Sequence, residues 1–193
     1  MKTISVEKLL DSDLISTEES YDLVERSVLN PQITGAEILE LDLPAKNRVE
    51  ALLQPEFFSE TQLRELACDF AEHTLPIFES HAPEDKRPRR CLEVARLHFK
   101  GKASSHKLGV AIKDARRSMW RFQRTEHRSA FEASYAVLLL EYECIGEMAR
   151  SVAQYAQLAA HHKAWESRKN NVVPMLNRER EAAWQLVKII EKL

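Results

Sequence analysis

The sequence predicts an all-α protein, a multi-helix bundle, from three observations. The chain of 193 residues contains only 4 Gly, and its residues are 44% hydrophobic and 30% charged. Apolar residues recur at three- and four-residue steps over long stretches, which is the spacing of one helix face. Several of these stretches begin with Ser or Thr followed three residues later by Glu or Gln, the capping box that starts a helix. Strands longer than a few residues are therefore not expected.

We expect one continuous folded unit with two parts, an acidic N-terminal helical subdomain over residues 1–58 and a helical bundle over residues 59–193. The length is sufficient to bury a core without disulfides. In the first part, short helices are separated by prolines and carry periodic apolar residues, which favours a packed cap over a disordered tail. Helix starts are expected there at Ser5, Ser16, Thr34 and Pro44.

The bundle is organised around residues 63–101, a kinked helical hairpin of two amphipathic helices joined by a charged turn. A capping box of Ser59 and Gln62 starts the first helix. Pro76 lies inside its apolar pattern and removes a backbone donor, so a kink or break is expected near Glu72–His73.

The second helix of the hairpin has signals at both ends. Asp85 is expected to pair with Arg87 or Arg89, or to cap this helix. Gly101 ends it as the residue after the C-cap. The next helix begins at Ser104 or Ser105 and buries an apolar seam, made of Leu108, Ile112, Ala115, Met119 and Phe122.

The longest apolar pattern runs from Thr125 or Ser129 to about Lys163 and predicts a single long helix. Gly146 is its weak point, where a bend or a close helix crossing is expected. A last helix is expected over about residues 175–191.

Charge is distributed unevenly, although the net charge is only −2. Residues 1–60 carry mostly Asp and Glu, whereas residues 86–128 carry fourteen Lys and Arg against three acidic residues. Such asymmetry indicates a charged partner or pairing between the two halves of the chain, and the sequence leaves both open. The candidate partner-binding residues are Arg87, Arg89, Arg90, Arg116, Arg117, Trp120, Arg121 and Arg124.

The sequence contains no recognisable motif for catalysis, cofactors or metals. Its four glycines are scattered, so no phosphate-binding loop is expected, and there is no nucleophile elbow, C-x-x-C or H-E-x-x-H. Glu141, Glu143 and Glu147 lack the Glu-x-x-His pairing of a bundle metal site. His161 and His162 are adjacent and do not share a helix face. We therefore expect no enzyme activity, no cofactor and no metal ion.

Three cysteines, Cys68, Cys91 and Cys144, fall in helical patterns and are expected to be reduced thiols in or near the core. The N-terminus shows no signal-peptide pattern, and no stretch approaches the about 20 apolar residues of a membrane span. These features predict a cytoplasmic protein without a membrane partner.

Residues 63–101 also resemble a known family. The run LRELACDFAEHTLPIFES, a short acidic turn, RPRRCLEVAR and a helix-ending KG are similar to segments of the all-helical immunity-protein-five-like family. The matching positions are Leu63, Ala67, Cys68, Asp69, Ala71, Glu72, Leu75, Pro76, Phe78, Arg87, Pro88, Leu92, Glu93 and Ala95. The resemblance implies an all-helical protein that neutralises a toxin by binding it, with no catalytic residues to carry over.

Two hypotheses for function follow. The first is a non-enzymatic immunity-like or inhibitor protein that binds a partner protein (a toxin or effector). Its acidic N-terminal half suits a basic partner, and its arginine-rich helices suit an acidic one. The second is a nucleic-acid-binding or nucleic-acid-associated regulator that uses the basic face of residues 86–128. A third hypothesis, an enzyme with a site in the bundle core, would need a buried polar pocket, and no pattern in the sequence indicates one.

Overall fold

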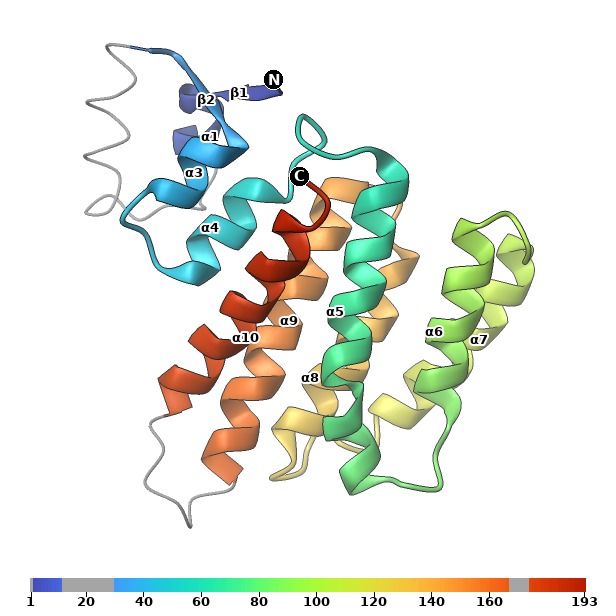
Figure 1. The fold of residues 1–193 in the computed structure, drawn as a ribbon. Helices are drawn as coiled ribbons and strands as arrows, with labels where there is room; N and C mark the ends of the chain where they lie inside the picture. Colours follow the sequence, from blue (N-terminus) through green and yellow to red (C-terminus); the bar gives the residue numbers. More distant parts are fainter. Residues whose placement is uncertain (1, 12–29, 167–173) are drawn as a thin grey trace.

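The computed structural model describes residues 2–11, 30–166 and 174–193, and these residues form a helical bundle (Figure 1). The helices are α1 Val6–Asp11, α3 Gly35–Glu40, α4 Ala45–Leu52, α5 Glu60–His81, α6 Arg87–Phe99, α7 Ser105–Met119, α8 Arg128–Leu138, the 3-10 turn η1 Leu139–Glu141, α9 Ile145–Glu166 and α10 Pro174–Ile190. In the described residues, the sheet is limited to β1 Thr3–Ser5 and β2 Gln32–Thr34, paired antiparallel with Ile4 opposite Ile33. The predicted all-α fold is confirmed.

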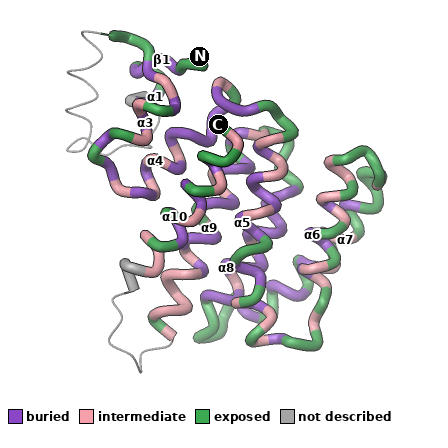
Figure 2. Tube along the Cα trace, in the orientation of Figure 1, coloured by how far each residue is buried: buried purple, intermediate pink, exposed green. Residues whose placement is uncertain are grey.

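Helix α5 lies at the centre of the bundle and packs against α6, α8 and α9. Its large apolar side chains, among them Leu66, Phe70 and Phe78, are fully buried. Figure 2 shows buried residues through α5, α8 and α9, whereas the outer sides of α6 and α7 are exposed. The α6–α7 pair is therefore an outer layer of the bundle.

The N-terminal elements lie on the other side of the bundle from α6 and α7 (Figure 1). Helix α4 packs against α10 and α9, and its residues Val49 and Leu52 are fully buried in the same core. No ion pair joins residues 2–11 or 30–58 to α6 or α7. None of the helices in the described parts of the chain combines the length and the apolar composition needed to cross a membrane.

Local helix signals in the sequence were reliable. The capping boxes of Thr34 with Glu37 and of Ser59 with Gln62 are both present, with all their hydrogen bonds. Ser104, rather than Ser105, caps α7 by accepting a hydrogen bond from the backbone N–H of Lys107 at 3.2 Å. The helix expected at Ser16 lies outside the described residues.

Helix α5 continues through Pro76, so the expected alternative of a break near Glu72–His73 is wrong. Pro76 is exposed, and the helix on both sides of it is held by buried residues such as Leu75 and Phe78. Packing therefore outweighs the one backbone hydrogen bond that proline removes. His73, three residues before Pro76, is stacked on the ring of Trp184, with 3.7 Å between the ring centroids.

The single long helix expected up to Lys163 is also wrong. The pattern divides into α8 and α9, which pack against each other, with η1 and a short linker between them. The linker contains Cys144, which is exposed rather than in or near the core. No Gly or Pro occurs between α8 and α9, but Gly146, where a bend or a close helix crossing was expected, is the second residue of α9 and lies directly after the reversal. Gly146 does lie in a close approach, because a Cβ there would be 3.4 Å from Pro55 Cδ.

Two glycines give a matched test of this fold. Gly101 has a φ of 69°, and its N–H donates to the His98 carbonyl at 2.8 Å in the turn that ends α6. Gly101→Ala forces a β-carbon into the left-handed region and should lower the free energy of unfolding by about 1 kcal/mol. Gly109 lies inside α7 with open space around it. Gly109→Ala should instead raise that free energy by about 0.5–1 kcal/mol.

Urea denaturation of the two variants measures both changes. If both substitutions changed the free energy of unfolding in the same direction, the backbone assigned to Gly101 and Gly109 would be contradicted.

Candidate partner-binding site

The predicted partner-binding residues lie on α6, on α7 and in the turns that flank them. Pro88 in the first turn of α6 and the Ser104 cap of α7 set where these helices begin. The expected seam of α7 is buried, including Phe122 just beyond the helix. Helix α7 ends at Met119, however, so Arg121 and Arg124 are in the following turns and not on a helix face shared with Arg116.

Most of the predicted arginines are paired with carboxylates nearby in the fold. Arg89 donates two hydrogen bonds to Glu79, from Nε at 2.6 Å and from Nη2 at 2.9 Å. This guanidinium holds the pKa of Glu79 below its usual range. Arg116 pairs with Glu141, and Arg117 pairs with Asp114 at 3.2 Å. Trp120 is 57% exposed.

Asp85 is the most heavily used carboxylate of this region, and its side chain is only 8% exposed. It accepts hydrogen bonds from Arg87 Nε at 2.8 Å, from the Arg87 backbone N–H at 3.2 Å and from Ser118 Oγ at 2.6 Å. The predicted pairing with Arg87 is thus confirmed. The Arg87 bond, followed by the Ser118 bond, holds the pKa of Asp85 well below its usual range. Asp85 therefore ties the turn before α6 to the end of α7.

Arg90 is different, because it is exposed and forms no ion pair within the described chain. It borders a groove of about 410 Å³ between α6 and α7. The apolar part of its lining is Val94, Val110 and Ala111, and its polar part includes Lys107, His106 and Asp114. Val110 is 48% exposed. The groove therefore offers an apolar surface bordered by Arg90 and Lys107, which form no ion pair in the described residues, and by Asp114, which is paired with Arg117.

Sequence reasoning missed Lys107, Val94 and Val110. Val110 had a signal, since it lies between Leu108 and Ile112 and off the stripe that those two residues share. An apolar residue off the buried stripe of an amphipathic helix is the pattern expected of an exposed apolar contact.

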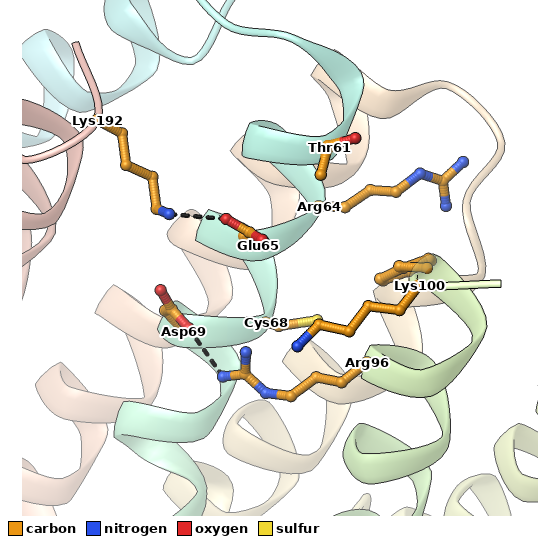
Figure 3. Close-up of a pocket in the computed structure, with 9 residues that line it drawn as sticks. Thr61, Arg64, Glu65, Cys68, Asp69, Arg96, Lys100 and Lys192 are labelled. Atoms are coloured by element: carbon orange, nitrogen blue, oxygen red, sulfur yellow. Dashed lines mark hydrogen bonds and ion pairs between the residues drawn. The ribbon is translucent and has the colours of Figure 1, made fainter. Parts of the chain in front are cut away.

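A second hollow, of about 200 Å³, lies between α5 and α6 near the C-terminus (Figure 3). Its charges are largely satisfied: Arg96 donates to Asp69 at 2.8 Å, and Lys192 donates to Glu65 at 2.8 Å. Cys68 lines this hollow, and burial raises the pKa of its thiol to about 12. The thiol is therefore protonated at neutral pH and is a poor nucleophile.

Comparison with known proteins gives one family. The family described as "Imm-5 like putative immunity protein" matches residues 56–119. The matched segment spans α5, α6 and α7, and so contains the Asp85 hydrogen bonds and the α6–α7 groove. No curated protein and no solved structure gives a significant match to the chain.

Substitution of Asp85 tests how much its hydrogen bonds contribute to the free energy of unfolding. Its pKa is lower in the folded than in the unfolded chain, so its ionised form stabilises the fold above about pH 4 and this contribution is lost on acidification. Asp85→Asn should lower the free energy of unfolding by about 2 kcal/mol at neutral pH. The variant should also lose less stability than the wild type on going from neutral pH to below about pH 4.

The matched control is Asp114→Asn, because the Asp114–Arg117 pair is exposed, at 48% and 64% of the two side chains. We expect a change below about 0.5 kcal/mol for it. Equal effects of the two substitutions, measured by denaturation across pH, would show that Asp85 has no special role.

Proposed function

We propose that this protein is an immunity-like binding protein that neutralises a partner protein, a toxin or effector, by occupying its surface, and that it catalyses no reaction. The observation that carries the proposal is the α6–α7 groove, an apolar surface with unpaired cations, inside the segment that matches the immunity-like family. The partner surface that fits it is an apolar side chain flanked by Asp or Glu.

The charge argument rests on which cations are already used. Three of the predicted arginines form ion pairs with carboxylates of their own chain: Arg87, Arg89 and Arg116. A partner would have to displace those carboxylates to reach them. Arg90 and Lys107 form no ion pair in the described residues, so an acidic partner can reach them without displacing a carboxylate. They can therefore attract such a partner and set its orientation.

The apolar argument concerns the lining of the groove. Val94 and Val110 leave a hollow with room for one or two side chains. Anchoring residues of protein interfaces fill pockets of this kind, and a polar border around them excludes water. A protein ligand therefore uses both features of the groove, whereas nucleic acid uses only the cations.

The internal ion pairs also weigh against nucleic acid as the main partner. Glu79, Asp114 and Glu141 are interspersed among the arginines of this face. Because these carboxylates are paired with Arg89, Arg117 and Arg116, few unpaired cations remain on this face for the successive phosphates of a nucleic acid. The non-enzymatic part of the proposal is supported by Cys68 and Cys91, because burial raises the pKa of each thiol to about 12.

The first experiment captures the partner of the full chain from its native cell and expresses that partner in a test host. Growth should be inhibited by the partner and restored when this protein is co-expressed. Calorimetry of the purified pair then measures the dissociation constant. A partner whose effect on growth is unchanged by co-expression would overturn the neutralising role.

Two valines of similar exposure test the groove itself. Val110 lies in the groove and is 48% exposed, and Val187 lies on α10 and is 52% exposed. Val110→Asp should weaken partner binding by about tenfold or more, since it places a charge in the apolar lining and repels an acidic partner. Val187→Asp should leave the dissociation constant unchanged. The reverse order of effects would place the interface on α10.

The cations are tested by reversing two charges at once. Arg90→Glu with Lys107→Glu should slow association with the partner by about tenfold at low salt, and the difference should shrink as salt is added. Lys46→Glu with Arg180→Glu makes the same change in net charge on α4 and α10 and should slow association far less.

Duplex and single-stranded DNA and RNA are tested with the same proteins at low and moderate salt. Micromolar binding of nucleic acid with a steep salt dependence, lost on reversal of Arg90 and Lys107, would assign the groove to nucleic acid and overturn the proposal.

A further inference from the structure

Three potential metal ligands meet at one end of the bundle, away from the groove. His81 is the last residue of α5, His127 directly precedes α8, and Glu166 is the last residue of α9. Their ligand atoms all lie within 4.8 Å of one another. The two imidazole rings are 4.5 Å apart between centroids, and His81 Nε2 lies 3.4 Å from Glu166 Oε2.

We propose that His81, His127 and Glu166 bind a divalent transition-metal ion of the zinc class, with water completing the coordination. Two tetrahedral ligands that each lie about 2.0–2.1 Å from zinc are themselves about 3.4 Å apart. His81 and Glu166 already have this separation. His127 is exposed, so its side chain has room to rotate toward the other two.

One atom of the cluster, Nε2 of His81, lacks a good hydrogen bond and is available to bind a metal ion. Nε2 of His81 is buried and makes no well-formed hydrogen bond, since its nearest carboxylate oxygen, Glu166 Oε2, is 3.4 Å away. Unpaired buried polar atoms are costly and rare in folded proteins. A metal ion bound to this lone pair would remove the cost.

The Glu166 carboxylate is held in place by hydrogen bonds from Ser129, which is not one of the three ligands. The Ser129 backbone N–H donates to Glu166 Oε1 at 2.9 Å, and Ser129 Oγ donates to Glu166 Oε2 at 2.6 Å. Metal-binding carboxylates and histidines are commonly oriented by such outer hydrogen bonds. A hollow of about 460 Å³ reaches His127 and Glu166 and gives an ion access from solvent.

The donor set decides the class of ion. Two imidazole nitrogens and one carboxylate are preferred by zinc and its neighbours, whereas magnesium and calcium prefer oxygen ligands. Lys163 and Arg128 bring positive charge to the same region, but Arg128 is paired with Glu132 at 3.1 Å. The ion would join the ends of α5 and α9 to the start of α8, which predicts a structural role in stabilising this end of the bundle.

The test is a titration of the untagged, metal-free full chain with Zn²⁺ by calorimetry. We expect one ion per chain with a micromolar or tighter dissociation constant, and a rise in Tm on binding. His127→Ala and Glu166→Gln should each weaken binding by about tenfold or more. His127 is exposed, so its variant should fold normally, which a melting curve in chelator checks. His106→Ala removes an exposed histidine elsewhere and should bind as the wild type does.

Co²⁺ in place of Zn²⁺ reports the ligands directly through its absorption spectrum. A tetrahedral spectrum without a thiolate band is expected. A thiolate band would place the ion at a cysteine, such as the exposed Cys144, and would overturn the proposal. Failure of the wild type to bind zinc, or binding by His127→Ala with unchanged affinity, would also overturn it. The groove contains none of these three residues, so failure of the metal proposal would not count against partner binding.

Discussion

The burial of α5 is the constraint on which the rest of the structure depends. One side of this helix is apolar and fully buried against α8 and α9, with Leu66, Phe70 and Phe78 as its large side chains. A neighbouring side carries carboxylates at positions 69, 72 and 79, whose spacing places them on one helix face. These carboxylates accept hydrogen bonds from Arg96 and Arg89 of α6. The same helix therefore organises the hydrophobic core and orients the basic layer outside it.

This arrangement explains the uneven charge of the sequence. The basic stretch lies next to acids of α5 and of the turn after it, and not next to the acidic N-terminal elements, which pack on α9 and α10 (Figure 1). Pairing is therefore local. Arg89 and Arg96 are paired with carboxylates of α5, whereas Arg90 and Lys107 form no ion pair in the described residues. A chain with little net charge thus keeps a small positive region at the groove, and long-range attraction of an acidic surface needs no more than that.

Sequence reasoning succeeded where a structure is set by neighbours in the chain. Thr34, Ser59 and Gly101 act through hydrogen bonds within a few residues, and each was found where it was expected. It failed where tertiary packing decides. Gly146, just after the reversal between α8 and α9, indicated a bend within one helix but not two separate helices, and α5 continues through Pro76 because its buried face holds it. The cluster of His81, His127 and Glu166 joins residues far apart in sequence, so no spacing rule reveals it. Five of the predicted arginines lie on α6 and α7, and the sequence could not show which of them pair with carboxylates of other elements, as Arg89 does with Glu79.

The matched segment and the metal cluster meet at the end of α5, and this gives the two proposals a physical relation. His81 ends α5, and Asp85 follows it in the turn that leads into α6. A metal ion at His81 would fix the start of this turn, and the hydrogen bonds from Arg87 and Ser118 to Asp85 fix its end. Both restraints reduce the freedom of the α6–α7 pair relative to the core. Because ordering a binding surface in advance lowers the entropy lost on association, the restraints favour a rigid groove over one that forms only on contact. Asp85 still holds the end of the turn when no metal is bound, so partner binding is expected to persist without metal.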